Sequence, residues 1–184
     1  MPTKKKNKSL SSEDKKLIEE IIRVDHAGEH GATQIYRGQL AIFKENTEFG
    51  KEIKEMADQE EIHKSTFDEY IVKENVKPTA LFPFWNLAGY ALGLGTALMG
   101  KKAAMACTIA VEEVIGKHYH EQAETLTEKK HSKLKKTLLK FRDDELEHKD
   151  IATTNDGEKT PGYKLMKFVI QSGCKVAIKL SEKI

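Results

Sequence analysis

The sequence predicts an all-α protein: a four-helix bundle made from a duplicated helical hairpin. Three observations lead to this fold class. Apolar residues recur at steps of three and four along four long segments. No proline occurs between Pro2 and Pro78, which permits long helices. The pattern Asp-x-Glu-x-x-His-Lys occurs twice, at 58–64 and at 143–149, which indicates two related halves.

Composition narrows the classes of protein that fit. A chain of 184 residues is long enough for one bundle domain, expected over 11–184 after a disordered Lys-rich tail at 1–10. The net charge of +2 is too small to indicate a nucleic-acid partner. No apolar stretch follows the tail, so we expect no secretory signal. The two cysteines are expected to be packed free thiols.

The first helix is expected to begin near Ser11, which can form a cap with Asp14, and to run toward Asn46. The second helix is expected to end before Pro78. Each of the four helices carries a carboxylate within its apolar stripe. The stripes are Ile18, Ile22, Asp25, Glu29, Ala32, Tyr36, Leu40 and Phe43; Ile53, Met56, Glu60, His63, Phe67 and Tyr70; Met105, Ile109, Glu112, Gly116, Tyr119, Ala123 and Leu126; and Leu134, Leu138, Phe141, Glu145, His148 and Ala152.

These four inward carboxylates predict a metal site. For any single Glu-x-x-His, the alternative is that exposed residues have this spacing by chance. Here, however, a carboxylate falls within the apolar stripe of all four helices, in the same order in both hairpins, which favours burial. Four buried carboxylates would be costly and would repel one another, and two divalent ions supply the balancing charge of +4. One Glu from each of two helices plus Glu-x-x-His from each of two others is the ligand set of ferritin-like di-iron and di-manganese bundles. Ligation without thiolate suits iron or manganese; iron is expected.

A metal-bound histidine usually donates its second ring N–H to an acceptor. Asp25, Asp58 and Asp143 lie on or near the inward faces and are the expected acceptors. An ordinary exposed charge is the alternative for each of them.

The stretch from Thr79 to Gly100 contains no charged residue over 22 positions, a length that raises the question of a transmembrane span. Pro83, Asn86 and four glycines favour instead a broken apolar segment that lies against lipid or covers an apolar tunnel.

Pro161 can start a last, amphipathic helix. Packing on the bundle, contact with an anionic membrane, or both, are the alternatives for it. Its apolar side is Met166, Val169, Gly173, Val176, Leu180 and Ile184, and its opposite side is Lys164, Lys167, Gln171, Lys175, Lys179 and Lys183.

Strings throughout the chain match a known family. They are IIRVDHAGEHGA, IYRGQ, PFWN, ALGLGTALMGKKAAMACTIAVEE, FRDDELEHKDI and GCKVAIKLSE. Together they resemble the demethoxyubiquinone hydroxylases of ubiquinone biosynthesis, which are carboxylate-bridged di-iron monooxygenases. The resemblance extends from about Leu17 to Ile184.

This resemblance implies roles for particular residues. Glu60 and Glu145 would bridge two irons, and Glu29 and Glu112 would be terminal ligands. A His-Tyr pair that follows the third-helix ligand would relay protons or electrons to the quinone, with core packing as the alternative for the tyrosine. The implied iron ligands are Glu29, Glu60, His63, Glu112, Glu145 and His148, and the implied relay pair is His118 and Tyr119.

The implied reaction is hydroxylation of the demethoxyubiquinol ring by O₂. It needs two iron ions per chain and an external electron donor: NADH, a reductase or the quinol itself. The prenylated substrate would be drawn from the membrane, with the chain bound peripherally at the cytoplasmic face of the cell membrane. Possible partners are other proteins of a ubiquinone-biosynthesis complex and a second copy of the chain in a homo-oligomer.

Two rival functions would use nearly the same ligands. A ferritin-like iron-oxidising protein would have no use for the long uncharged segment. A peroxide-consuming di-metal protein of the rubrerythrin type usually carries a cysteine-rich module, for which this chain lacks cysteines. A lipid-binding protein that had lost its metals would show an eroded ligand set, whereas all six residues are present.

Overall fold

The computed structural model describes residues 11–184, apart from the side chains of residues 128–130. In this range the chain is all-helical, which confirms the predicted fold class. The elements are α1 (Ser12–Leu40), α2 (Glu48–Lys73), α3 (Phe82–Leu98), α4 (Lys101–Thr125), α5 (Glu128–Thr154), the 3-10 helix η1 (Gly157–Lys159) and α6 (Tyr163–Ser181). The Lys-rich tail expected at 1–10 lies outside the described residues.

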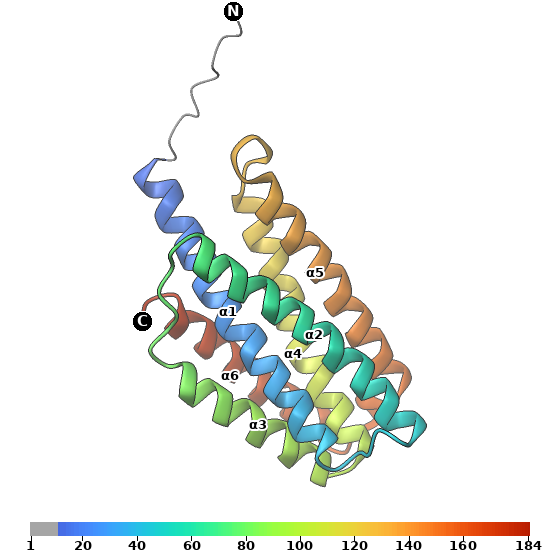
Figure 1. The fold of residues 1–184 in the computed structure, drawn as a ribbon. Coiled ribbons are helices and arrows are strands. Elements are labelled where there is room, and N and C mark those ends of the chain that lie inside the picture. Colours follow the sequence, from blue (N-terminus) through green and yellow to red (C-terminus); the bar gives the residue numbers. More distant parts are fainter. Residues whose placement is uncertain (1–10) are drawn as a thin grey trace, which may run out of the picture.

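Helices α1, α2, α4 and α5 form the bundle, in which α1 packs on α2 and α4 packs on α5 (Figure 1). Helix α3 lies along α1, and α6 lies along α4; both cover the side of the bundle that α1 and α4 form. The chain therefore contains two three-helix units in sequence. Each unit is a helical hairpin followed by a helix that packs back on the first helix of that hairpin.

The start of α1 follows its sequence signal. The Ser11 hydroxyl accepts a hydrogen bond from the Asp14 backbone N–H at 3.1 Å, and the Asp14 carboxylate accepts one from the Ser11 N–H at 3.2 Å. This capping box stabilises the first turn, as predicted. The helix ends at Leu40 rather than near Asn46, and Thr47 caps α2 by accepting from the Gly50 N–H at 3.0 Å.

The uncharged segment is not broken, which corrects the expectation from its proline and glycines. Pro83 lies in the first turn of α3, where its missing N–H costs little. The glycines serve close packing: a Cβ on Gly93 would lie 1.9 Å from the Ile35 carbonyl oxygen, and one on Gly89 would lie 2.6 Å from that of Gly31. Helices α1 and α3 thus touch backbone to backbone. Within residues 11–184, none of the helices combines the length and hydrophobicity that crossing a bilayer requires.

Helix α6 packs on the bundle, which is one of the alternatives expected for it. Ile170 and Cys174 pack against Cys107 and Val111 of α4. Most of the apolar side identified in the sequence is exposed, with Val169 59 % exposed. The helix therefore carries three faces: one packed, one apolar and exposed, and one bearing lysines.

The polar layer of the bundle lies between two apolar clusters. One cluster includes Ile22, Phe67 and Phe141, and the other includes Tyr36, Met56 and Ile109. Along every bundle helix the predicted metal ligands fall between residues of these two clusters. Apolar side chains therefore close off the polar layer at both ends.

Candidate metal centre

The six residues expected as metal ligands come together in the middle of the bundle. Each is at most 2 % exposed. Their ligand atoms form two overlapping groups, and within each group all atoms lie within 4.8 Å of one another. Glu60 and Glu145 belong to both groups. The groups are Glu29, Glu60, His63 and Glu145, and Glu60, Glu112, Glu145 and His148.

Each imidazole turns its Nδ1 atom toward the carboxylates. His63 Nδ1 lies 3.2 Å from a Glu145 oxygen and 3.6 Å from a Glu29 oxygen. His148 Nδ1 lies 3.1 Å from a Glu60 oxygen and 3.3 Å from a Glu145 oxygen. The Glu-x-x-His spacing produces this arrangement, because residues three apart share one face of a helix. The shared position of Glu60 and Glu145 is the geometry that two bridging carboxylates require.

Unpartnered polar atoms show that the site fits metal ions. Among the described residues, several ligand atoms are buried and have no hydrogen-bond partner, which is costly unless a cation binds them. They are Glu29 Oε2, Glu60 Oε1, His63 Nδ1, Glu145 Oε2 and His148 Nδ1. Four carboxylates and two imidazoles without a thiolate form a donor set that suits iron or manganese.

Electrostatics support the same conclusion. Burial raises the pKa of Glu29 and Glu112 well above the usual value, and repulsion from neighbouring carboxylates raises it further. Burial opposes protonation of His148, but the nearby carboxylates of Glu145 and Glu60 outweigh it and raise the pKa to about 10. Without cations the site therefore retains protons. Two divalent ions would replace them and balance the four carboxylates.

The outward ring nitrogens bind acceptors other than the predicted ones. His63 Nε2 lies 3.1 Å from Asp144, and His148 Nε2 lies 2.5 Å from the Gln59 side-chain oxygen. Asp25, Asp58 and Asp143, which we expected in this role, bond instead to Gln122, Lys54 and Arg142, respectively.

The true acceptors hold equivalent positions in the two repeats, as the expected Asp58 and Asp143 also do, so the repeat alone did not distinguish them. Gln59 and Asp144 occupy the same place in the two repeats, directly before Glu60 and Glu145. The interaction is crossed, because each acceptor binds the histidine of the opposite hairpin.

The two tyrosines that follow the terminal ligands by seven residues also cross between hairpins. The Tyr36 hydroxyl donates to Glu112 at 2.9 Å, and the Tyr119 hydroxyl donates to Glu29. His118 lies outside the six-residue site: its Nε2 is 2.9 Å from the Gln122 side-chain nitrogen. Of the predicted relay pair, only Tyr119 touches a predicted metal ligand.

An apolar cavity of about 370 Å³ lies beside the metal centre, between α1, α3, α4 and α6. Gly28 and Val111, which directly precede Glu29 and Glu112, are among its lining residues, as are Trp85 and Leu92 of α3. The uncharged helix therefore covers an apolar space, one of the two roles expected for it.

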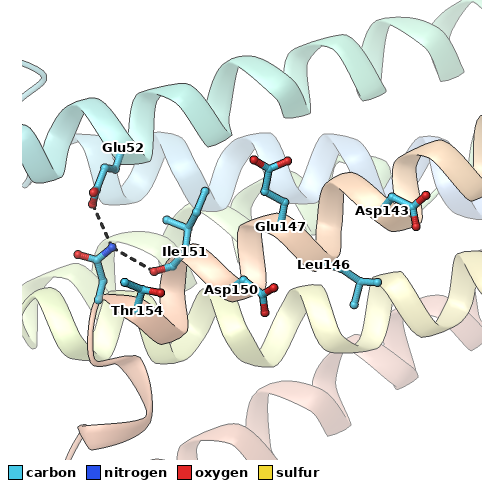
Figure 2. A pocket seen from close by; sticks show the side chains of 8 residues that line it. Glu52, Asp143, Leu146, Glu147, Asp150, Ile151 and Thr154 are labelled. Atoms are coloured by element: carbon cyan, nitrogen blue, oxygen red, sulfur yellow. Dashed lines mark hydrogen bonds between the residues drawn. The ribbon is translucent and has the colours of Figure 1, made fainter.

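A second hollow has the opposite character. It lies between α2 and α5 and has a volume of about 470 Å³. Figure 2 shows the carboxylates of Glu52, Asp143, Glu147 and Asp150 along it, and none of the six central residues lines it. Its charge makes it unsuited to an apolar ligand.

Fold and site together define a class of protein: a helical bundle with a buried carboxylate-histidine site suited to two cations, beside an apolar cavity. A family described as "Ubiquinone biosynthesis protein COQ7" matches residues 16–181. The chain belongs to this family.

Individual relatives agree with this assignment. The chain is 51 % identical over 179 residues to "NADPH-dependent 3-demethoxyubiquinone 3-hydroxylase, mitochondrial" of Bos taurus, covering 96 % of this chain and 82 % of the relative. The Homo sapiens protein of the same name is 49 % identical over the same shares. A "3-demethoxyubiquinol 3-hydroxylase" of Rhodospirillum rubrum is 45 % identical, covering 91 % of this chain and 79 % of the relative.

Proposed function

We propose that the chain is a di-iron monooxygenase that hydroxylates the demethoxyubiquinol ring in ubiquinone biosynthesis. The sharing of Glu60 and Glu145 between two ligand groups carries the metal part of this proposal. The names of the relatives support the reaction. When bound, iron would supply the activation of O₂, which amino-acid side chains lack.

The chain's own residues would fix and shield the metal centre. Glu60 and Glu145 would bridge the two ions, with Glu29 and His63 completing one side and Glu112 and His148 the other. Asp144 and Gln59 orient the imidazoles by accepting their Nε2–H groups. The apolar clusters above and below exclude water, which strengthens every electrostatic interaction inside.

We retain Tyr119 as a relay residue, because it contacts one of the six central residues directly. Its hydroxyl donates to Glu29, so it can hold a proton at that carboxylate. His118 would act through Gln122, which bonds both His118 and the buried Asp25. This chain of polar groups leads from the predicted relay histidine toward α1, one turn from Glu29.

The apolar cavity would receive the substrate. A prenylated quinol is largely apolar, and the cavity lies next to the terminal ligands without a charged residue in its lining. An iron-storing protein would have no use for such a space, which favours the hydroxylase over that rival.

Exposed apolar residues on α3 and α6 support membrane contact. Phe84 and Leu87 of α3, and Leu165 and Phe168 of α6, are each at least 59 % exposed. Lysines of α6 flank this surface and can attract anionic headgroups. The membrane would be the one that holds the quinone pool: the cytoplasmic face of the cell membrane in a bacterium, or a mitochondrial membrane in a eukaryote, as in the names of the animal relatives.

The electron donor would be external. The animal relatives are named NADPH-dependent, which favours a reduced nicotinamide over the quinol itself. Association with other proteins of ubiquinone biosynthesis, or with a second copy of the chain, would require surfaces outside the metal centre.

Metal analysis of the purified protein, combined with lipid extraction and a hydroxylation assay, tests the proposal. We expect about two irons per chain, a bound prenylquinone in the extract, and O₂-dependent conversion of demethoxyubiquinol. A protein depleted of metal that retains full turnover would contradict it.

A further inference from the structure

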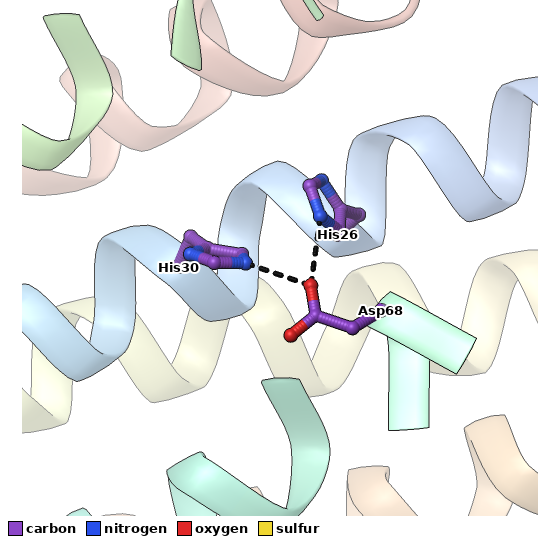
Figure 3. Close-up of side chains that lie close together, drawn as sticks. All are labelled: His26, His30 and Asp68. Carbon is purple, nitrogen blue, oxygen red and sulfur yellow. Dashed lines mark hydrogen bonds and ion pairs between the residues drawn. The ribbon is translucent and has the colours of Figure 1, made fainter. Parts of the chain in front are cut away.

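A second cluster of metal-ligating side chains lies outside the metal centre. His26 and His30 are one turn apart on α1, and Asp68 faces them from α2 (Figure 3). Both imidazole Nε2 atoms lie 3.0 Å from the same Asp68 oxygen, Oδ1. Figure 3 shows the two rings converging on this carboxylate. None of the three residues belongs to the six-residue site.

Packing holds both rings in place. Phe82, at the start of α3, stacks on His26 with ring centroids 5.4 Å apart and meets His30 edge-on at 4.5 Å. The two imidazoles also touch each other, with centroids 4.6 Å apart. His26 is buried. The ligand atoms are thus positioned before any ion binds, which lowers the entropic cost of binding.

We propose that His26, His30 and Asp68 bind a single Zn²⁺ ion. In a tetrahedral zinc site with bonds of 2.0–2.1 Å, neighbouring ligand atoms are about 3.3 Å apart, close to the 3.0 Å between each Nε2 and Asp68 Oδ1. Two imidazoles and one carboxylate are a known zinc donor set that leaves one position open. The side chains of Asp68 and His30 are 44 % and 18 % exposed, so the ion can enter from solvent and keep a water ligand.

The protonation state and orientation of the three side chains leave their ligand atoms available to a cation. Burial, and then repulsion from His30, lower the pKa of His26, so its ring is neutral and offers a lone pair at neutral pH. Lys64 lies 3.6 Å from Asp68 Oδ2, the other oxygen of the carboxylate. That ion pair orients Asp68 and leaves Oδ1 directed at the histidines. The competing arrangement is a pair of histidines that both donate a hydrogen bond to Oδ1.

The ion would have a structural effect confined to the first three-helix unit. It would join α1 to α2 directly beneath Phe82, the first residue of α3. Because an ion that binds only the folded chain stabilises it by mass action, zinc would tighten the junction of all three helices. This site is independent of the proposed hydroxylase activity.

The test uses iron-loaded protein and Zn²⁺ alone. Equilibrium dialysis followed by elemental analysis should give one zinc per chain with the iron content unchanged, and crystals soaked in zinc should show anomalous scattering beside the three residues. Asp68→Asn and His30→Gln keep hydrogen-bonding groups of similar size, yet each should weaken zinc binding by at least about 10-fold. His120→Gln, which changes an exposed histidine on α4, is the matched control and should bind zinc normally.

Three outcomes would overturn the proposal. Absence of zinc uptake would leave a hydrogen-bonded histidine pair only. Uptake matched by an equal loss of iron would assign the zinc to the metal centre. Unchanged binding in both cluster variants would place the ion elsewhere. Circular dichroism and iron content show whether each variant is folded. If one of the two cluster variants fails to fold, zinc binding by the other still tests the proposal.

Discussion

The two three-helix units, α1–α3 and α4–α6, are nearly alike on the inside and different on the outside. Inside, each contributes a Glu, a Glu-x-x-His and a tyrosine, and each supplies the acceptor for the other's histidine. Outside, the third helices differ: α3 is uncharged and touches α1 backbone to backbone, whereas α6 carries lysines and packs through side chains. The candidate metal ligands all lie on the four bundle helices, and the covering helices contribute none of the six.

The largest expected effect comes from removing a ligand that both units share. In Glu60→Ala or Glu145→Ala, both ions lose a ligand at once, so we expect iron content to fall from about two per chain to below one and hydroxylation to fall more than about 100-fold. In Glu112→Ala only one ligand group is broken, so part of the iron should remain. Elemental analysis and a hydroxylation assay provide the comparison, with circular dichroism to check the helical fold. Equal iron loss in the shared and the unshared variants would contradict the bridging geometry.

The next effect separates the two covering helices. In Gly93→Ala the new methyl group would overlap the Ile35 backbone oxygen, which cannot move without shifting α1. We expect a loss of about 1–3 kcal/mol in the free energy of unfolding. Gly173→Ala makes the same change on α6, where a Cβ meets nothing within 4 Å, so the better helix propensity of alanine should stabilise the protein by up to about 1 kcal/mol. Urea denaturation measures both. Effects of the same sign and size would show that α3 and α6 are attached in the same way.

Part of the fold and of the site could be predicted from the sequence alone. Periodicity identified which face of each bundle helix is buried. The duplicated motif supplied four of the six central residues, and the apolar stripes of the other two helices supplied Glu29 and Glu112. Neither pattern could identify the partner of each outward ring nitrogen. Asp143 and Asp144 differ by about 100° around α5, and only the rotation of α5 against α2 decides which of them meets His63.

The covering helices were harder to predict for a related reason. Glycines in the uncharged segment suggested a break, because an isolated glycine weakens a helix. In the folded chain they allow the close approach of α1, an interaction that no local pattern encodes. Likewise, the pattern of α6 left open whether the helix packs on the bundle, contacts a membrane or does both, and Val176 and Leu180 of its apolar side are exposed in the structure. A helix with two apolar faces gives no local signal for the face that is packed.

The smallest predicted effect concerns the acceptors of the two candidate ligand histidines, which differ between the units. His63 bonds to the carboxylate of Asp144, whereas His148 bonds to the neutral amide of Gln59. A carboxylate acceptor makes an imidazole a stronger ligand, although Lys140, 3.3 Å from Asp144, partly offsets this. We therefore expect the two ions to bind with unequal affinity, the tighter one beside His63.

Exchanging the acceptors tests this inequality. Asp144→Asn should weaken binding beside His63 by about 10-fold, the lower end of the range for such partners, and bring the two affinities together. Gln59→Glu should strengthen binding beside His148, and the double variant should reverse the order in which the ions bind. Stepwise titration of the metal-free protein with Fe²⁺ under anaerobic conditions, followed by Mössbauer spectroscopy, distinguishes the two positions. If the wild type and Asp144→Asn gave the same titration curve, the difference between Asp144 and Gln59 would have no effect on the metals, and the inner layers of the two units would be equivalent in function as well as in geometry.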